Sequence, residues 1–213
     1  MSPRTNNLLL GAALCAAMVS AHGVGAQEAR LLSIRDDATR NRVRIFVEAA
    51  RLRGTPTEPL VSRALEGIAF KADAKRIEQA LAALEKRMRR AKELLAPHAT
   101  VDELAAAADA IANRVPEKAI SDLRRIAPRR TITVEIGVLT ELVAKGVKPS
   151  VAATMVRDLM AKGATGAQLT ELNAAVQQDV ALGVTPMEAL VLRTRGVMSL
   201  LPPAASVNAA QRP

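Results

Sequence analysis

Aromatic residues are almost absent from this sequence. Its 213 residues include two phenylalanines and no tyrosine or tryptophan, although hydrophobic residues make up 49% of the chain. The core must therefore consist of Leu, Val, Ile, Met and Ala, with Phe46 and Phe70 also at apparent core positions. This composition suits closely packed helices and is unusual for a β-sandwich or barrel, so it predicts an all-α fold. It also argues against specific nucleic-acid binding, because single strands are usually held by stacking on aromatic rings.

Cysteine and histidine are equally scarce, which limits the chemistry that the chain can perform. Cys15 and His22 fall in a segment expected to be removed, so the mature chain keeps only His98. A lone histidine provides neither a nucleophile–histidine pair nor a set of metal ligands. No glycine-rich loop follows a strand, which gives no support for a nucleotide site. We therefore predict no catalytic residues, no metal, no cofactor and no enzymatic activity.

The first 26 residues have the pattern of a secretory signal peptide. Arg4 precedes an apolar run over 8–21, and Val24-Gly25-Ala26 has small or compact residues at the −3 and −1 positions of a cleavage site. The run is too short to span a bilayer, which takes about 20 residues. We expect residues 1–26 to be cleaved, leaving an exported, periplasmic or extracellular protein with no transmembrane span. The alternative is an uncleaved membrane anchor.

One short sequence motif recurs along the chain and predicts where helices end and begin. In its fullest form, Gly183 suits the left-handed position after a helix and Val184 folds back on that helix. Thr185 can cap the next helix, Pro186 fits its first position, and Glu188 completes a capping box. Thr100 and Glu103 have the same capping-box spacing. Variants of this motif occupy residues 53–57, 112–116, 144–149 and 161–166.

These joints, together with apolar residues spaced three and four apart, predict an array of short antiparallel helices. Because each helix carries a stripe that it cannot bury alone, we expect helical hairpins stacked as in a solenoid. The break at 127–134, where 131–134 has extended character, suggests an N-terminal part over 27–127 and a C-terminal repeat part over 128–201. Residues 202–213 read as a disordered tail. Helices are expected near 37–53, 58–70, 74–95, 101–113, 116–126, 134–145, 149–162, 166–182 and 186–195.

Two basic clusters are the best candidates for a binding site. The chain has 30 Lys and Arg against 21 Asp and Glu, a net charge of +9, so it will tend to meet anionic surfaces or partners. Arginine suits phosphate and carboxylate groups because its guanidinium fork binds them with two parallel hydrogen bonds. The alternative is that both clusters are solvated helix faces and corners. The candidate residues for binding an anion or a partner are Arg87, Arg90, Arg124, Arg125, Arg129 and Arg130.

Two segments carry a resemblance to a group of proteins. The run 54–67, Gly-Thr-Pro-Thr-Glu-Pro-Leu-Val-Ser-Arg-Ala-Leu-Glu-Gly, and the run 146–149, Gly-Val-Lys-Pro, are similar to predicted exported, Ala-rich helical proteins of bacteria. The resemblance rests on helix-boundary residues. It implies a fold and an exported location, and it transfers no functional residues because those proteins have no assigned activity.

The sequence favours a non-catalytic helical scaffold or protein-interaction module of the bacterial envelope, whose partner is another envelope protein. An extended helical array offers much surface and little chemistry, which matches this composition. The alternative function is a basic adaptor that binds an anionic polymer or a lipid surface through the arginine clusters.

Overall fold

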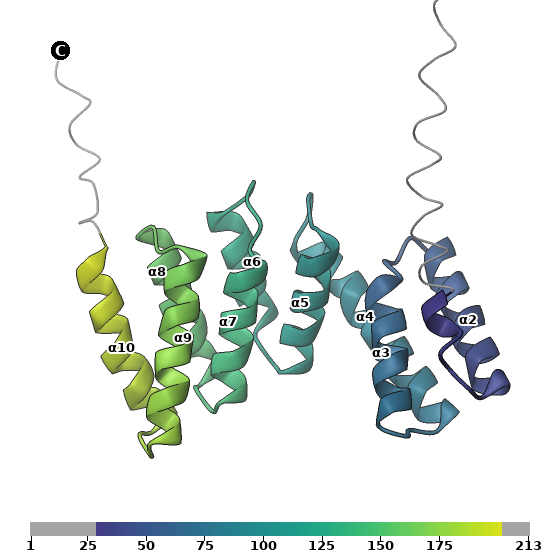
Figure 1. Cartoon of the computed structure of the whole chain (residues 1–213). Helices are drawn as coiled ribbons and strands as arrows, with labels where there is room; N and C mark the ends of the chain where they lie inside the picture. Colours follow the sequence, from purple (N-terminus) through teal and green to yellow (C-terminus); the bar gives the residue numbers. More distant parts are fainter. Residues whose placement is uncertain (1–28, 202–213) are drawn as a thin grey trace, which may run out of the picture. The chain divides into compact units, whose positions relative to one another are not determined.

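The computed structural model describes residues 29–201, and this part of the chain is helical without any strand (Figure 1). The expectations for the signal peptide over 1–26, which contains Cys15 and His22, and for the tail over 202–213 lie outside the described residues. No helix between residues 29 and 201 is both long enough and apolar enough to cross a membrane. After a short turn of helix at 29–31, the helices are α2 (Asp37–Leu52), α3 (Glu58–Ala69), α4 (Ala74–Leu94), α5 (Val101–Ala112), α6 (Glu117–Ile126), α7 (Thr133–Ala144), α8 (Pro149–Ala161), α9 (Gly166–Ala181) and α10 (Pro186–Leu200).

The chain divides into two compact units, and the division falls inside α4, between Glu85 and Lys86. The boundary that we expected at 127/128 lies within the second unit, between α6 and α7, which pack against each other. The break at 127–132 is therefore a turn between neighbouring helices of one unit. Its extended part is shorter than the sequence suggested, because α7 already begins at Thr133 and only Thr131 and Ile132 stay outside the helix.

The first unit has a small aliphatic core built by α2, α3 and the first half of α4. Leu60 and Val61 of α3 are fully buried together with Leu81 of α4, and Phe46 of α2 packs against this cluster while staying partly exposed. At its edge the guanidinium of Arg53 donates two hydrogen bonds, of 2.7 and 2.9 Å, to the buried carboxylate of Glu85.

The second unit repeats a two-helix element. Its first helices, α5, α7 and α9, begin 32 and 33 residues apart and pack side by side, α5 on α7 and α7 on α9 (Figure 1). The helices that follow them are α6, α8 and α10; α6 packs on α8, and α10 packs on α9. We call the first set the α5–α7–α9 layer. Neighbouring repeats thus bury the apolar stripes that a single hairpin leaves open, as expected for stacked repeats.

The recurring motif forms the same turn between helices each time. At the end of α7, Gly146 has a φ of 99°, its N–H bonds the carbonyl of Val143, and the N–H of Val147 bonds the carbonyl of Leu142, both at 3.0 Å. This is the Schellman arrangement, which satisfies carbonyls that a helix end leaves free. Six described helices end in this way, with a residue of positive φ at Gly54, Lys71, Arg114, Gly146, Gly163 and Gly183.

The predicted starts of helices are confirmed as well. The hydroxyl of Thr100 accepts a hydrogen bond from the N–H of Glu103, whose carboxylate accepts from the N–H of Thr100. At Thr185 the capping box is modified, because the carboxylate of Glu188 accepts a hydrogen bond from the Thr185 hydroxyl and not from the Thr185 backbone N–H. These local bonds explain why the joints could be placed from the sequence alone.

Replacing Gly146 with alanine is expected to lower the free energy of unfolding by about 1 kcal/mol, because a Cβ is strained at positive φ. An added Cβ would lie 3.7 Å from Pro186, an ordinary contact, so the cost lies in the backbone. Arg114→Ala is the matched control: Arg114 already has a φ of 62° at the equivalent joint, so little should change. Urea unfolding of both variants measures this, and equal losses would contradict the explanation.

Two large apolar residues at helix ends are exposed. Phe70, expected in the core, is 79% exposed, and Leu52 at the end of α2 is 76% exposed. Both stand at the end of their helices, two residues beyond the inward-facing Ile68 and Ala50, and therefore point to the opposite side of the helix. The short apolar stripe ends before them.

Candidate functional site

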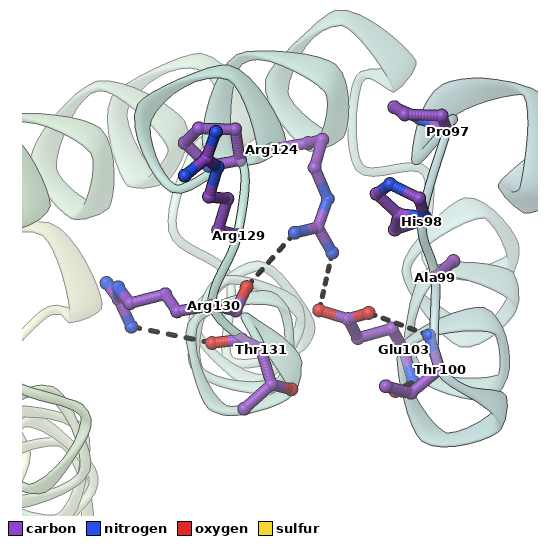
Figure 2. A pocket seen from close by; sticks show the side chains of 10 residues that line it. Pro97, His98, Ala99, Thr100, Glu103, Arg124, Arg129, Arg130 and Thr131 are labelled. Carbon is purple, nitrogen blue, oxygen red and sulfur yellow. Dashed lines mark hydrogen bonds and ion pairs between the residues drawn. The ribbon is translucent and has the colours of Figure 1, made fainter.

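A pocket of about 570 Å³ opens at the turn between α6 and α7, within the second unit (Figure 2). One wall is the segment before α5, with His98, and the other is the turn after α6, with the candidate residues Arg129 and Arg130. We call it the corner pocket. Its lining residues are Pro97, His98, Ala99, Thr100, Glu103, Arg124, Pro128, Arg129, Arg130 and Thr131.

A buried ion pair between Glu103 of α5 and Arg124 of α6 holds the two walls together. Glu103 is 2% exposed, and its Oε1 accepts from Nη2 of Arg124 at 2.5 Å and from the N–H of Ile132 at 2.8 Å. Its Oε2 accepts from the N–H of Thr100 at 2.9 Å. One carboxylate therefore caps its own helix and ties it to α6 and to the start of α7.

Arg124 also fixes the turn that follows α6. Its Nη1 donates to the carbonyls of Ala127 and Arg130, both at 3.0 Å, as Figure 2 shows for Arg130. Its Nε is buried and has no hydrogen-bond partner among the described residues. The guanidinium of Arg124 therefore has mainly a structural role. The sequence had suggested instead that Arg124 binds an anion or a partner.

The ionisation of Glu103 is shifted by its surroundings. Burial alone would raise its pKa, but the N–H groups of Thr100 and Ile132 and the guanidinium of Arg124 more than offset this, so that the net pKa is lowered. A carboxylate with a lowered pKa in the folded state stabilises the fold above its unfolded pKa and loses that contribution as the pH falls through the folded value.

The Glu103–Arg124 pair is therefore expected to weaken in acid. Its stabilisation should be complete above about pH 4.3, the ordinary value for glutamate, and should decline below it. Urea unfolding of the wild type and of Glu103→Gln over a pH series tests this. The difference in unfolding free energy between the two proteins should shrink as the pH falls through that range. A difference that stays constant would contradict the assignment, because other carboxylates titrate equally in both proteins.

The remaining arginines of the corner differ in what they contact. Arg130 pairs with the buried carboxylate of Glu135 in α7, and Arg125, which does not line the pocket, pairs with Asp122. Arg129 lines the pocket, is exposed and makes no ion pair with any described residue. His98, also exposed, lines the opposite wall in Figure 2. Arg129 and His98 are therefore the side chains that a bound anion would meet first.

The other candidate cluster lies elsewhere in the second unit. Arg90 of α4 pairs with Glu117, the first residue of α6, and with Glu93; Glu117 and Glu93 both raise its pKa. Arg87 is half-buried, and its Nε is buried without a partner among the described residues. Because Arg124 stands near the end of the same helix that Glu117 begins, the structure places the two clusters at opposite ends of α6 and does not bring them together.

Sequence reasoning missed the acidic partners in this site. Glu103 carried a signal, since its spacing from Thr100 marks a capping box, but its second role depends on α6 and α7 lying beside α5. Within residues 29–201 no group of three or more His, Cys, Asp or Glu side chains is placed to hold a metal ion. Comparison of the chain with protein families, with curated proteins and with solved structures gave no match. The resemblance to exported Ala-rich bacterial proteins therefore stays a prediction.

Proposed function

We propose that the protein is a non-catalytic, exported helical scaffold that binds another envelope protein through the second unit. The observation that supports this most is the α5–α7–α9 layer, three parallel helices from successive repeats. Their outer sides stay exposed because the buried residues of each helix face the other elements. A stack of hairpins is a common way to present a broad binding surface.

The outer side of this layer is built largely from small residues. Ala105, Gly137 and Ala174 lie on the outer sides of α5, α7 and α9, and a Cβ added at Gly137 would meet no atom within 4 Å. Small side chains let the backbone of a partner approach closely and lose little conformational freedom on binding. These small side chains support an interface on the outer side of the layer.

The test is affinity capture from envelope extracts with the tagged full chain as bait, washed at low and at high salt. A protein retained through the high-salt wash supports the proposal. It should be lost with Gly137→Gln, which places a longer neutral side chain on the layer, and kept with Thr154→Gln on the exposed side of α8. Capture that is the same for the wild type and both variants would place the interface elsewhere.

The corner pocket supports a second proposal, the basic adaptor for an anionic polymer or lipid surface. Arg129 and His98 line it, are exposed and form no ion pair in the described chain. Binding to anionic vesicles should be sensitive to salt and weaker for Arg129→Gln. Arg125→Gln removes the same charge outside the pocket lining and serves as the control. Equal weakening by both variants would indicate general charge attraction and would leave the pocket without a role.

A further inference from the structure

Charge is distributed unevenly over the second unit. The sequences of α5, α7 and α9 contain no lysine or arginine, whereas the whole chain has 30 of them against 21 acidic residues. The helices of the α5–α7–α9 layer do contain acidic residues, including the exposed Asp102, Asp109, Glu141 and Glu171. A basic protein thus carries one layer whose own charged side chains are all acidic.

These acidic residues are set apart by what they lack. Between residues 29 and 201 most carboxylates form an ion pair, and only Asp36, Asp102, Asp109, Glu141, Glu171 and Glu188 do not. Asp36 and Glu188 hydrogen-bond to the starts of their helices. The other four all lie in the α5–α7–α9 layer. None of these four carboxylates forms an ion pair with a cation of the described chain.

The three helices are in parallel register, which gathers Asp102, Asp109 and Glu141 on one surface. Glu171 lies apart from them and lines a hollow with Leu192 and Arg193 of α10. Near the start of α9, the Cβ position at Gly166 lies 3.4 Å from Val134 near the start of α7. About two to three turns further on, Glu141 Oε2 accepts hydrogen bonds from the side-chain amides of Asn173 and Gln177. Asp109 of α5 stands 32 residues before Glu141, the same spacing as the starts of the two helices. Equivalent exposed positions therefore face the same way.

We propose that this surface binds a segment of the partner protein that carries lysine or arginine residues, laid across α5, α7 and α9. The inference rests on the proposed function and names the chemistry of the partner. Unpaired carboxylates among small side chains leave room for long cationic side chains to lie flat and pair with them, so that both sides complement each other in charge. Arg114 and Lys145 follow α5 and α7, but neither forms an ion pair with Asp109 or Glu141 in the described chain.

Oligolysine provides a defined probe for this surface. We expect a labelled oligolysine peptide to bind the full chain at low salt, measured by fluorescence anisotropy, despite the protein's net charge of +9. Oligoglutamate of the same length is the comparison. The variant D102N/D109N/E141Q should bind oligolysine about tenfold more weakly, because attraction between opposite charges drives this binding and the variant lacks three of the negative charges. Amides keep the hydrogen-bond acceptors that Asn113, Asn173 and Gln177 use.

The matched control is E48Q/E66Q/E93Q, which removes three exposed acidic charges from ion pairs outside this layer. It should keep the affinity of the wild type, and thermal unfolding followed by circular dichroism should show both variants folded. Absence of oligolysine binding, or equal weakening by both variants, would overturn the inference. Loss of self-association in D102N/D109N/E141Q alone would also overturn it, by assigning the basic segment to a second copy. An envelope partner could also be lost with Gly137→Gln but retained by D102N/D109N/E141Q. That result would leave the proposed function standing and would refute the inference that the partner binds through lysine or arginine residues.

Discussion

Replacing Glu103 with alanine is expected to lower the free energy of unfolding by about 3–5 kcal/mol, the usual cost of removing one member of a buried ion pair. The substitution leaves the buried guanidinium of Arg124 uncompensated and removes the acceptor of the N–H groups of Thr100 and Ile132. Three elements lose their connection at once. Urea unfolding followed by circular dichroism measures the loss, and Arg124→Ala should cost a comparable amount because it strands the carboxylate.

Arg125→Ala is the control for this prediction, because Arg125 is the next residue of α6 and pairs with Asp122 with its side chain 72% exposed. It should change the free energy of unfolding by less than about 1 kcal/mol. A double-mutant cycle between Glu103 and Arg124 then isolates their coupling from other effects of each substitution. Equal losses for Arg124→Ala and Arg125→Ala would show that the buried pair contributes nothing beyond a surface pair.

Leu139→Ala in α7 is expected to lower the free energy of unfolding by about 2–5 kcal/mol. Leu139 is 0% exposed, and its helix packs against α5, α6, α8 and α9, so the cavity has walls on several sides that cannot all move inward. Because stacked repeats stabilise one another through their interfaces, amide hydrogen exchange should also become faster in α5 and α9.

Leu192→Ala in α10 is the comparison for the cavity, since Leu192 is 61% exposed and the same atoms are removed there without leaving a closed space. Its effect should stay within about 0.5 kcal/mol. If Leu139→Ala accelerated exchange in α7 alone, the repeats would be energetically independent, and the account of the second unit as a cooperative stack would be wrong.

The helices themselves could be predicted closely from the sequence because their ends are determined by neighbouring residues. Thr165 and Gln168 form a capping box, and Gly163 takes the left-handed position that ends α8, all within a few residues of chain. α10 was the exception. It continues to Leu200, beyond the expected end near 195, since no joint of this kind follows it. The positive φ of Lys71 could not be predicted in this way either, because no glycine marks that position.

The candidate site could be located but not understood from the sequence. The arginine-rich turn does line a pocket, yet whether a given arginine is free depends on carboxylates contributed by other helices. Arg124 meets Glu103 21 residues earlier in the chain, whereas Arg129 meets no partner among the described residues. No local pattern distinguishes these two. The acidic α5–α7–α9 layer was also overlooked, because net charge averages over a chain and hides how it is sorted between layers.

The stacking of the second unit has a consequence for how it comes apart. α10 packs chiefly on α9 and has no later helix in the described chain to hold its other side, and Leu192 and Leu200 remain exposed on it. Under a force applied at the carboxyl end, α10 should peel away first, followed by α9, while α7 still rests on α5. The unit would then yield in steps, one hairpin at a time, and could close again by the same route.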